Sequence, residues 1–240
     1  MYGGDLKGNV WRFNLSDPAI PANWNVVKLA TLADSTGVAQ PITPPPELVE
    51  VDGRRLVFVG TGSLLGSGDL ASAQRQSMYG MVDNMSPAPL IANPRSDLVN
   101  KAVTVTAGGI RTIDPTHVDY SIARGWYFDL PSGGERVNTA PAAAFGVLVF
   151  STNQPSPLAC SSQSYLHAVD VASGGQLPST AFAAGETPWS GKSLGGSLAS
   201  RPVIVVLPNG SVQSITHKSD TTLTTSRLPE SLGGKVRKVG

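Results

Sequence analysis

The sequence predicts an all-β protein, and three observations support this fold class. Short runs of β-branched and aromatic residues, for example at 10–15 and 56–61, recur along the chain between glycine, proline, asparagine and serine residues. The 240 residues include 26 glycines and 19 prolines, which frequently interrupt regular structure. Helical periodicity is almost absent, and its best candidate is the short segment 70–75.

The individual strands follow from these runs, in which apolar and polar positions tend to alternate. We expect the apolar runs 56–61, 147–151 and 203–207 to be buried. The segment 63–76, which is rich in glycine and serine, should be an exposed loop. Strands are predicted at 10–15, 26–32, 48–51, 56–61, 78–82, 103–106, 125–130, 147–151, 165–171, 203–207, 212–216 and 223–226.

A repeated pattern indicates how the strands are grouped. In five segments a small or polar residue leads into an aromatic or apolar pair, and most of these segments end in Asp or Asn. Taking Asn14, Asp83, Asp129, Asp170 and Thr216 as equivalent positions gives spacings of 69, 46, 41 and 46 residues. A period of about 40–50 residues with several strands in each period is typical of a β-propeller.

The sequence therefore predicts a β-propeller-like arc of about four blades, each a four-stranded antiparallel sheet, that forms part of a larger modified ring. Such an arc would expose the flank of a terminal blade that a complete ring buries. The whole of 1–240 is interpreted as one propeller region. Its blade repeats are expected at roughly 1–43, 44–100, 101–140, 141–198 and 199–240.

Composition excludes several classes of protein. The 18 Lys and Arg residues balance 17 Asp and Glu residues, so a nucleic-acid partner is not expected. No apolar run approaches the roughly 18 residues of a membrane-spanning helix. The single cysteine, Cys160, excludes a disulfide scaffold within the chain and a cysteine-clustered metal site. The first residues already read as β-structure, so we expect that Met1 does not mark a natural domain start.

Four sequence motifs, taken together and in this order along the chain, resemble those of a known protein family. The first is YGGDLKGNVWRFNL at 2–15, and the second is FVGTG at 58–62 followed by SMYGMVD at 77–83. The third and most specific is RGWYFDLPSGGERV at 124–137. The fourth joins LVFSTNQPSPLAC at 148–160 to YLHAVDVASGG at 165–175. Together these motifs resemble those of the PilY/PilC type IV pilus-associated proteins, from residue 2 to about residue 220.

This resemblance implies a modified propeller at the C-terminal end of a large exported protein of a Gram-negative bacterium. Members of this family lie at the pilus tip, the outer membrane or cell surface, or in the periplasm. They support pilus assembly against retraction, twitching motility and surface attachment. The implied partners are minor pilins or the pilus tip complex, and a host or surface receptor. The calcium loop of some members would precede Tyr2, so calcium is expected only in a full-length protein and no cofactor is expected here.

Several residues are candidates for sites. Asp114 and Asp119, with His117 between them, could hold a cation, although two carboxylates are few for calcium and a solvated turn is the preferred interpretation. The segment 66–71 fits the G-x-G-x-x-G/A dinucleotide pattern, but no βα unit follows it. No G-x-S-x-G is present, and 195–199 only approaches it. We expect no catalytic group, with His117, His167 and His217 far apart and outside any Ser–His–carboxylate chain.

The recurring aspartates, among them Asp5, Asp83, Asp129 and Asp170, are expected to cap turns by accepting backbone N–H bonds. The recurring aromatics should pack between blades. They are Trp11, Tyr79, Trp126, Tyr127 and Tyr165.

The leading hypothesis is a non-enzymatic pilus biogenesis and tip adhesion protein. Its protein partners are expected on the loops 63–76, 84–101, 154–163 and 184–200. Two alternatives remain open, a quinoprotein-like dehydrogenase and an outer-membrane assembly scaffold. The dehydrogenase is disfavoured because such enzymes commonly carry adjacent cysteines, and the scaffold because it would lack RGWYFDLPSGGERV.

Overall fold

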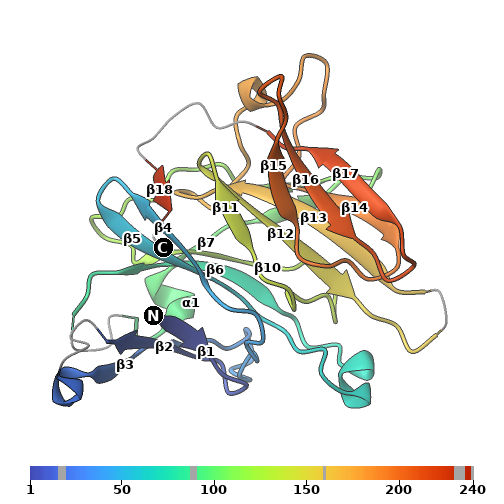
Figure 1. The fold of residues 1–240 in the computed structure, drawn as a ribbon. Helices are drawn as coiled ribbons and strands as arrows, with labels where there is room; N and C mark the ends of the chain where they lie inside the picture. The colour runs from blue at the N-terminus through green and yellow to red at the C-terminus, as the bar shows by residue number, and fades with distance from the viewer. Residues whose placement is uncertain (16–19, 87–90, 159–160, 230–235, 239–240) are drawn as a thin grey trace.

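The structure, a computed structural model, describes residues 1–15, 20–86, 91–158, 161–229 and 236–238. Within these residues the chain is all-β and forms four sheets that follow one another along an arc (Figure 1). The all-β fold and the propeller-type arrangement that the sequence predicts are therefore confirmed. The sheets are numbered first to fourth in chain order.

The first sheet has the strand order β1-β2-β3, and the second has the order β18-β4-β5-β6-β10-β7. The strands of the first sheet are β1 (Tyr2–Gly4), β2 (Asn9–Asn14) and β3 (Asn25–Thr31). Those of the second are β4 (Glu47–Val51), β5 (Arg54–Gly60), β6 (Ser77–Asp83), β7 (Val99–Asn100), β10 (Gly125–Asp129) and β18 (Val236–Lys238).

The third sheet has the order β11-β12-β13-β14-β9-β8, and the fourth has the order β15-β16-β17. The strands of the third sheet are β8 (Val103–Val105), β9 (Arg111–Ile113), β11 (Ala142–Ala144), β12 (Val147–Gln154), β13 (Gln163–Asp170) and β14 (Gly191–Gly196). Those of the fourth are β15 (Val203–Val206), β16 (Val212–His217) and β17 (Leu223–Arg227).

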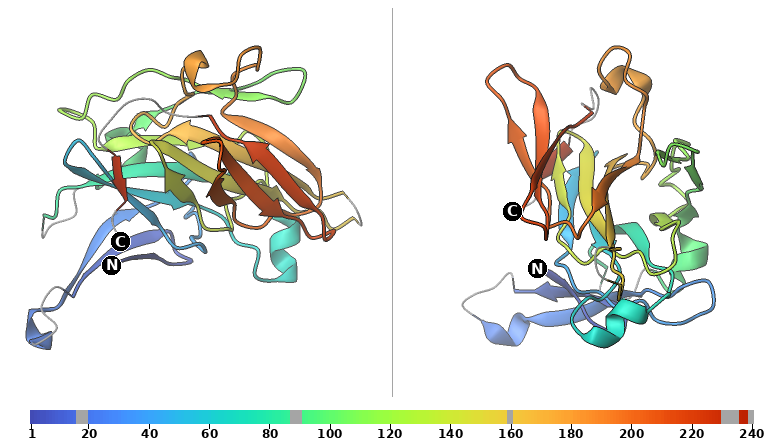
Figure 2. Two further views of the ribbon diagram at one scale, coloured as in Figure 1. Left: turned by 45° about the horizontal axis from the view of Figure 1, so that its top comes forward. Right: turned by 90° about the vertical axis from the view of Figure 1, so that its right-hand side faces the viewer.

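Three apolar cores lie between consecutive sheets, and Figure 2 shows the sheets stacked face to face. Val10 and Leu29 of the first sheet share a core with Val59 of the second. Phe58 and Trp126 of the second sheet pack with Phe150 of the third. Val149, Trp189 and Val212 belong to the core between the third and fourth sheets. This face-to-face packing around an arc is the arrangement of propeller blades.

The number of strands in a blade departs from the prediction at the ends of the arc. Each middle sheet contains the expected four antiparallel strands, β4-β5-β6-β10 and β11-β12-β13-β14. Short strands extend both middle sheets to six, whereas the first and fourth sheets have three strands each. The outer faces of the first and fourth sheets have no neighbouring sheet within the described residues.

The segment 101–140 is not the separate blade that the repeat pattern predicts. Its strand β10 pairs with β6 in the second sheet, where Trp126 lies opposite Gly80. Its hairpin β8–β9 instead joins the third sheet through β14. The repeated pattern in 124–130 and 76–83 therefore marks two neighbouring strands of one sheet, which explains why the period overcounts the blades.

Burial follows the prediction for two of the three apolar runs. Strand β12 is buried up to its last residue, and β5 is buried from Leu56 onward. Strand β15 is not buried, and Val203 and Val206 are 48% and 55% exposed. Within the described residues, the fourth sheet packs against another sheet, the third, on one face only, and β15 is one of its edge strands. The run 203–207 is therefore not packed between two sheets as β5 and β12 are.

Helical structure is scarce among the described residues. The segment 63–76 is largely exposed, as predicted, and contains the 3₁₀ helix η2 (Ser67–Ala71). A single α-helical turn, α1 (Pro94–Asp97), follows β6, and the short 3₁₀ turns η1 (Pro21–Asn23) and η3 (Ser179–Ala181) complete the set. No helix in the described part of the chain has the length and apolar character needed to cross a membrane.

Candidate functional site

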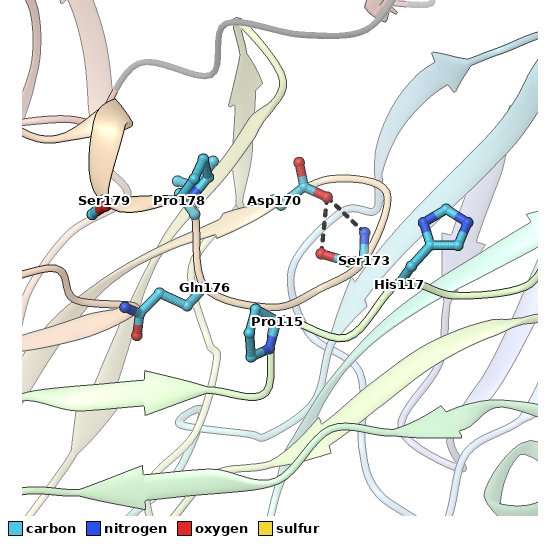
Figure 3. A pocket seen from close by; sticks show the side chains of 8 residues that line it. Pro115, His117, Asp170, Ser173, Gln176, Pro178 and Ser179 are labelled. Carbon is cyan, nitrogen blue, oxygen red and sulfur yellow. Dashed lines mark hydrogen bonds between the residues drawn. The ribbon is translucent and has the colours of Figure 1, made fainter.

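Two loops at one end of the third sheet border an open pocket of about 490 Å³ (Figure 3). One loop follows β9 and contributes Pro115 and His117. The other follows β13 and contributes Asp170, Gln176 and Pro178. The pocket lies within the size range of ligand sites, and its lining combines prolines with a few polar side chains.

The second of these loops is a tight turn held by its own aspartate. Asp170 Oδ1 accepts hydrogen bonds from the backbone N–H of Ser173, at 2.7 Å, and from the Ser173 hydroxyl (Figure 3). It also accepts the backbone N–H of Ala172 at 3.0 Å. Gly174 has a φ of +68°, and a Cβ there would lie 2.3 Å from Cδ2 of Trp126. Only glycine fits this contact, so the turn is locked against the second sheet.

The predicted cation candidates lie on the first loop, where each carboxylate stabilises its own turn. Asp114 Oδ1 accepts the N–H and hydroxyl of Thr116, and Asp119 Oδ1 accepts those of Ser121. These bonds lower the pKa of both carboxyl groups. No group of three or more His, Cys, Asp or Glu side chains in the described ranges could hold a metal ion. The geometry thus gives Asp114 and Asp119 the turn role that the sequence favoured.

A buried lysine fixes the first loop from beneath. The Lys101 ammonium donates to the backbone carbonyl of Thr116, and the residue is only 1% exposed. Burial lowers the pKa of Lys101, while Asp114 and Asp170 oppose that shift. This hydrogen bond therefore fixes the position of the first loop relative to the third sheet.

A smaller pocket of about 250 Å³ lies on the other side of the first loop. It is lined by His117 again, together with Arg54 from the second sheet and Tyr120. The Arg54 guanidinium carbon lies 5.6 Å from the centre of the Tyr120 ring, and the Tyr120 hydroxyl donates to the carbonyl of Ala172. The exposed His117 therefore separates two pockets on one surface, which suits recognition of an extended partner.

The segment GERV at 134–137 joins the second sheet to the third. The backbone of Arg136 exchanges two 2.9 Å hydrogen bonds with Asn153 of β12, and Val137 N–H donates to Thr61 beside β5. The Arg136 guanidinium donates to the carbonyls of Ser63, Asp69 and Ser72 and thus holds the loop 63–76. Arg136 of the motif RGWYFDLPSGGERV therefore has a structural role, because it holds the loop 63–76 against the segment between the two sheets.

Glu135 forms the centre of a fully buried polar cluster. Arg111 of β9 binds its carboxylate through both terminal nitrogens, at 2.5 and 2.9 Å, and the Thr152 hydroxyl donates at 2.5 Å. Arg111 Nη1 also lies 3.0 Å from His167 Nε2. Because arginine keeps its protons, Nε2 must accept this bond, and His167 is neutral.

This cluster places a hydroxyl, an imidazole and a carboxylate together, which the sequence did not lead us to expect. Thr152 Oγ1 lies 3.4 Å from His167 Nε2, and Glu135 Oε1 lies 3.7 Å from it. All three side chains are buried, and the carboxylate is neutralised by Arg111. A catalytic triad needs a hydroxyl that substrate can reach, so this group has the character of a structural polar core.

The cluster makes stability depend on pH. Burial alone would raise the pKa of Glu135, but the hydrogen bonds and positive charge of Arg111 outweigh this effect, and the pKa falls to about 2 from 4.5. Burial also lowers the pKa of His167 below 6.5. In both cases the unfolded chain binds protons more readily, so stability is complete above pH 6.5 and is lost as the pH falls. We expect Tm to be level above pH 7, to decline below pH 6.5 and to decline further below pH 4.5. The stabilisation by ionised Glu135, about 3 kcal/mol, is present above pH 4.5 and is lost as the pH falls toward 2.

Thermal melts at a series of pH values test this expectation. His167→Asn should remove the decline between pH 6.5 and 4.5, whereas replacing the exposed His117 and His217 by Asn should leave it unchanged. A melting temperature that stays level down to pH 4.5 in the wild-type chain would contradict the role of His167.

The recurring aspartates divide into two kinds. Asp5, Asp83 and Asp170 accept backbone N–H bonds in turns, as predicted. The bonds described for the Asp129 carboxylate are to side chains, namely the Arg95 guanidinium, at 2.8 Å, and the Ser77 hydroxyl, whereas Asp83 combines its turn bond with an ion pair to Arg12. The Arg95–Asp129 ion pair borders a depression of about 650 Å³ between the first sheet and α1.

The recurring aromatics pack at the joints between sheets, as expected, in the cases of Tyr79, Tyr127 and Trp126. Tyr79 and Tyr127 are stacked with ring centres 5.7 Å apart in the core between the first and second sheets. Trp126 Nε1 donates to the carbonyl of Val171, which directly follows β13 of the third sheet. Tyr165 instead lies beneath Arg111, whose guanidinium carbon is 3.5 Å from its ring centre, and Trp11 donates to Asp5.

The remaining motifs resolve into loops and strand ends. The segment 66–71 contains the whole of η2 and leads to β6, so no βα unit accompanies the dinucleotide-like pattern. In 195–199, the Ser197 hydroxyl donates to Asp220 rather than to a histidine. Cys160 lies outside the described residues. Sequence reasoning assigned no role to Glu135, Arg111 or Lys101. Glu135 lies within the motif RGWYFDLPSGGERV, and that position was the signal that could have drawn attention to it.

The fold and this surface together define a class of protein, namely a β-propeller domain that presents loop-built pockets over a rigid polar core. Residues 1–89 match the family model described as the PilY1 beta-propeller domain. A Type IV pilus biogenesis factor PilY1 homolog from Xylella fastidiosa (strain Temecula1) is 31% identical over 256 residues, which cover 100% of this chain and 20% of that protein. The chain thus belongs to the PilY1 family, and the resemblance to the PilY/PilC proteins is confirmed.

Two further comparisons agree. Type IV pilus biogenesis factor PilY1 of Pseudomonas aeruginosa (strain PAO1) is 25% identical over 228 residues, with 75% of this chain and 20% of that protein covered. The chain spans about a fifth of the length of these curated relatives. The crystal structure of the Pseudomonas aeruginosa PilY1 C-terminal domain matches with a TM-score of 0.70 and 22% identity, over 94% of this chain and 56% of that domain. At this identity the match supports the fold alone.

Proposed function

We propose that this chain is a non-enzymatic propeller region that supports type IV pilus biogenesis. The observation that carries the proposal is the 31% identity to a pilus biogenesis factor over all of this chain. The curated relatives extend far beyond the matched region, so the role of the whole protein is part of the proposal. We further propose an exported location at the pilus tip, cell surface or periplasm of a Gram-negative bacterium.

The geometry supports a recognition role over an enzymatic one. The pockets around His117 are built by loops whose carboxylates are occupied by their own turns. The one hydroxyl–imidazole–carboxylate group in the described residues is buried and neutralised. We propose that minor pilins of the tip complex, or a surface receptor, bind across the loops that carry His117 and Gln176. Any calcium control is proposed to lie in residues that would precede Tyr2.

The proposal is tested in the bacterium that encodes the chain. Deleting the coding region for these residues should strongly reduce surface pili and twitching motility, and restoring the wild-type sequence should recover both. The paired variant His117→Ala with Gln176→Ala should fold normally and still lower piliation or surface attachment. The matched control is His217→Ala, which alters an exposed histidine on β16 away from these loops.

Two outcomes would overturn the proposal. Normal piliation and motility after the deletion would remove the biogenesis role. A bound quinone, recognised by its visible or near-ultraviolet absorption in the purified protein, would favour the dehydrogenase alternative instead. Unchanged function of the His117 and Gln176 variant would reject only the assignment of the binding surface.

A further inference from the structure

The sulfur of Met85 lies among hydrogen-bond donors at the joint between the first and second sheets. Met85 follows β6, and its side chain is 49% exposed. Its backbone has a φ of +64°, a region that residues other than glycine rarely adopt. The N–H of Met85 donates to Asp83 Oδ1 at 2.8 Å, which holds this strained turn in place.

Three donors from both sheets surround this sulfur atom. Nη1 of Arg55, on β5 of the second sheet, lies 2.9 Å from Sδ. The Tyr2 hydroxyl and Arg12 Nη1, from β1 and β2 of the first sheet, lie 3.8 and 3.9 Å from it. A thioether sulfur is a weak acceptor, so its hydrogen bonds with these three donors are weak.

The acceptors nearby are already engaged. Asp83 accepts the Tyr2 hydroxyl at 2.5 Å and Arg12 Nη1 at 2.6 Å, and burial together with Asp83 raises the pKa of Tyr2 to about 12. Arg12 Nη2 also donates to the Ser86 carbonyl, so two guanidinium groups and a phenol share one carboxylate, one carbonyl and one sulfur. The site has a surplus of donors that a stronger acceptor on the sulfur would satisfy.

We propose that Met85 is an oxidation site whose sulfoxide strengthens the joint between the first and second sheets. The oxidant is a peroxide. The sulfur lone pair attacks one peroxide oxygen, the O–O bond breaks and an S–O bond forms. The sulfur loses two electrons to the peroxide. With hydrogen peroxide, the departing hydroxide takes the proton from the transferred hydroxyl and leaves as water. The sulfoxide oxygen is a strong acceptor placed among Arg55, Arg12 and Tyr2.

The other methionines provide internal references. Met78 and Met81 lie on β6 and are 0% exposed, so peroxide in solution does not reach their sulfur atoms. Met1 is 75% exposed and should also be oxidised. Although Met1 precedes Tyr2, its sulfur accepts none of the hydrogen bonds described for these donors, so its oxidation should leave stability unchanged. Oxidation of methionine ordinarily disturbs packing, so a gain in stability would distinguish Met85.

The test treats the 240-residue chain with hydrogen peroxide, maps the modified methionines by peptide mass spectrometry and compares melting temperatures. Met85 and Met1 should each gain one oxygen, whereas Met78 and Met81 should remain reduced. Because charge-assisted hydrogen bonds are stronger than those to a thioether, the melting temperature should rise by about 2–4 °C on oxidation.

Two variants make the result specific. Met85→Leu keeps an apolar side chain of similar size and should show no rise after peroxide treatment. Arg55→Gln should still be oxidised at Met85 but should lose most of the rise. The proposal is overturned if Met85 stays reduced while Met1 is oxidised, if wild-type Tm does not rise, or if either variant rises as much as the wild type.

Discussion

Replacing Glu135 with Gln is expected to destabilise the chain by about 3–5 kcal/mol. The substitution removes the negative charge that both terminal nitrogens of Arg111 bind and leaves a guanidinium buried without a counterion. The side chains of Glu135 and Arg111 are 0% and 2% exposed, so solvent cannot replace the lost partner. Unfolding in urea, with the transition followed by circular dichroism, measures the change.

The matched control is Glu50→Gln, which alters a carboxylate opposite Arg55 on a partly exposed stretch of β4. A surface pair of this kind contributes about 0–1 kcal/mol. The double variant Arg111→Met with Glu135→Leu should regain much of the stability, because it removes both buried charges together. Equal stability of Glu135→Gln and the wild type would refute the account of the buried cluster.

Replacing Trp126 with Ala is expected to destabilise the chain by about 3–5 kcal/mol. The indole is fully buried between the second and third sheets, with its ring centre 5.8 Å from that of Phe58 and 5.9 Å from that of Phe128. Alanine leaves a cavity at this joint and deprives the Val171 carbonyl of the 3.2 Å hydrogen bond from the indole. Chemical denaturation again provides the measurement.

Trp24→Ala is the control, since that side chain is 47% exposed and its removal should change stability by no more than about 0.5 kcal/mol. Trp126→Phe should fall between the two, because it keeps part of the packing but loses the hydrogen bond. Comparable effects of Trp126→Ala and Trp24→Ala would show that the joint between the sheets does not depend on this ring.

Strand positions could be predicted well because they depend on local pattern. Strands β5 and β12 are continuous apolar runs, and β2 alternates, so each is recognisable within a few residues. Strands β9 and β14 were not predicted. Strand β9 has three residues, and β14 contains three glycines in GKSLGG, so neither has the local signature of a strand.

Pairing between distant strands could not be predicted in the same way. The similarity of β10 to β6 suggested two blades, yet the two strands are neighbours in one sheet. Close pairing there depends on Gly80, where a Cβ would lie 2.4 Å from Trp126 Cε2. That dependence is visible only when the two strands are placed side by side.

The candidate site was predicted only in part for the same reason. Asp114, Asp119 and Asp170 form bonds within their own turns, so their local sequence already suggests what they do. The Arg111–Glu135 pair joins residues 24 positions apart on different elements. No local pattern in the sequence identifies such a pair.

The chain leaves the second sheet after β7, forms β8 and β9 of the third sheet, and returns to the second sheet as β10. The two middle sheets are therefore interlaced. As the chain emerges from a ribosome or a translocation channel, the second sheet cannot gain β10 until residue 129 has appeared. The hairpin β8–β9 must then wait for β14, which ends at residue 196. We therefore expect the two middle sheets to form together rather than blade by blade, and the second sheet to be completed only when β18 pairs with β4.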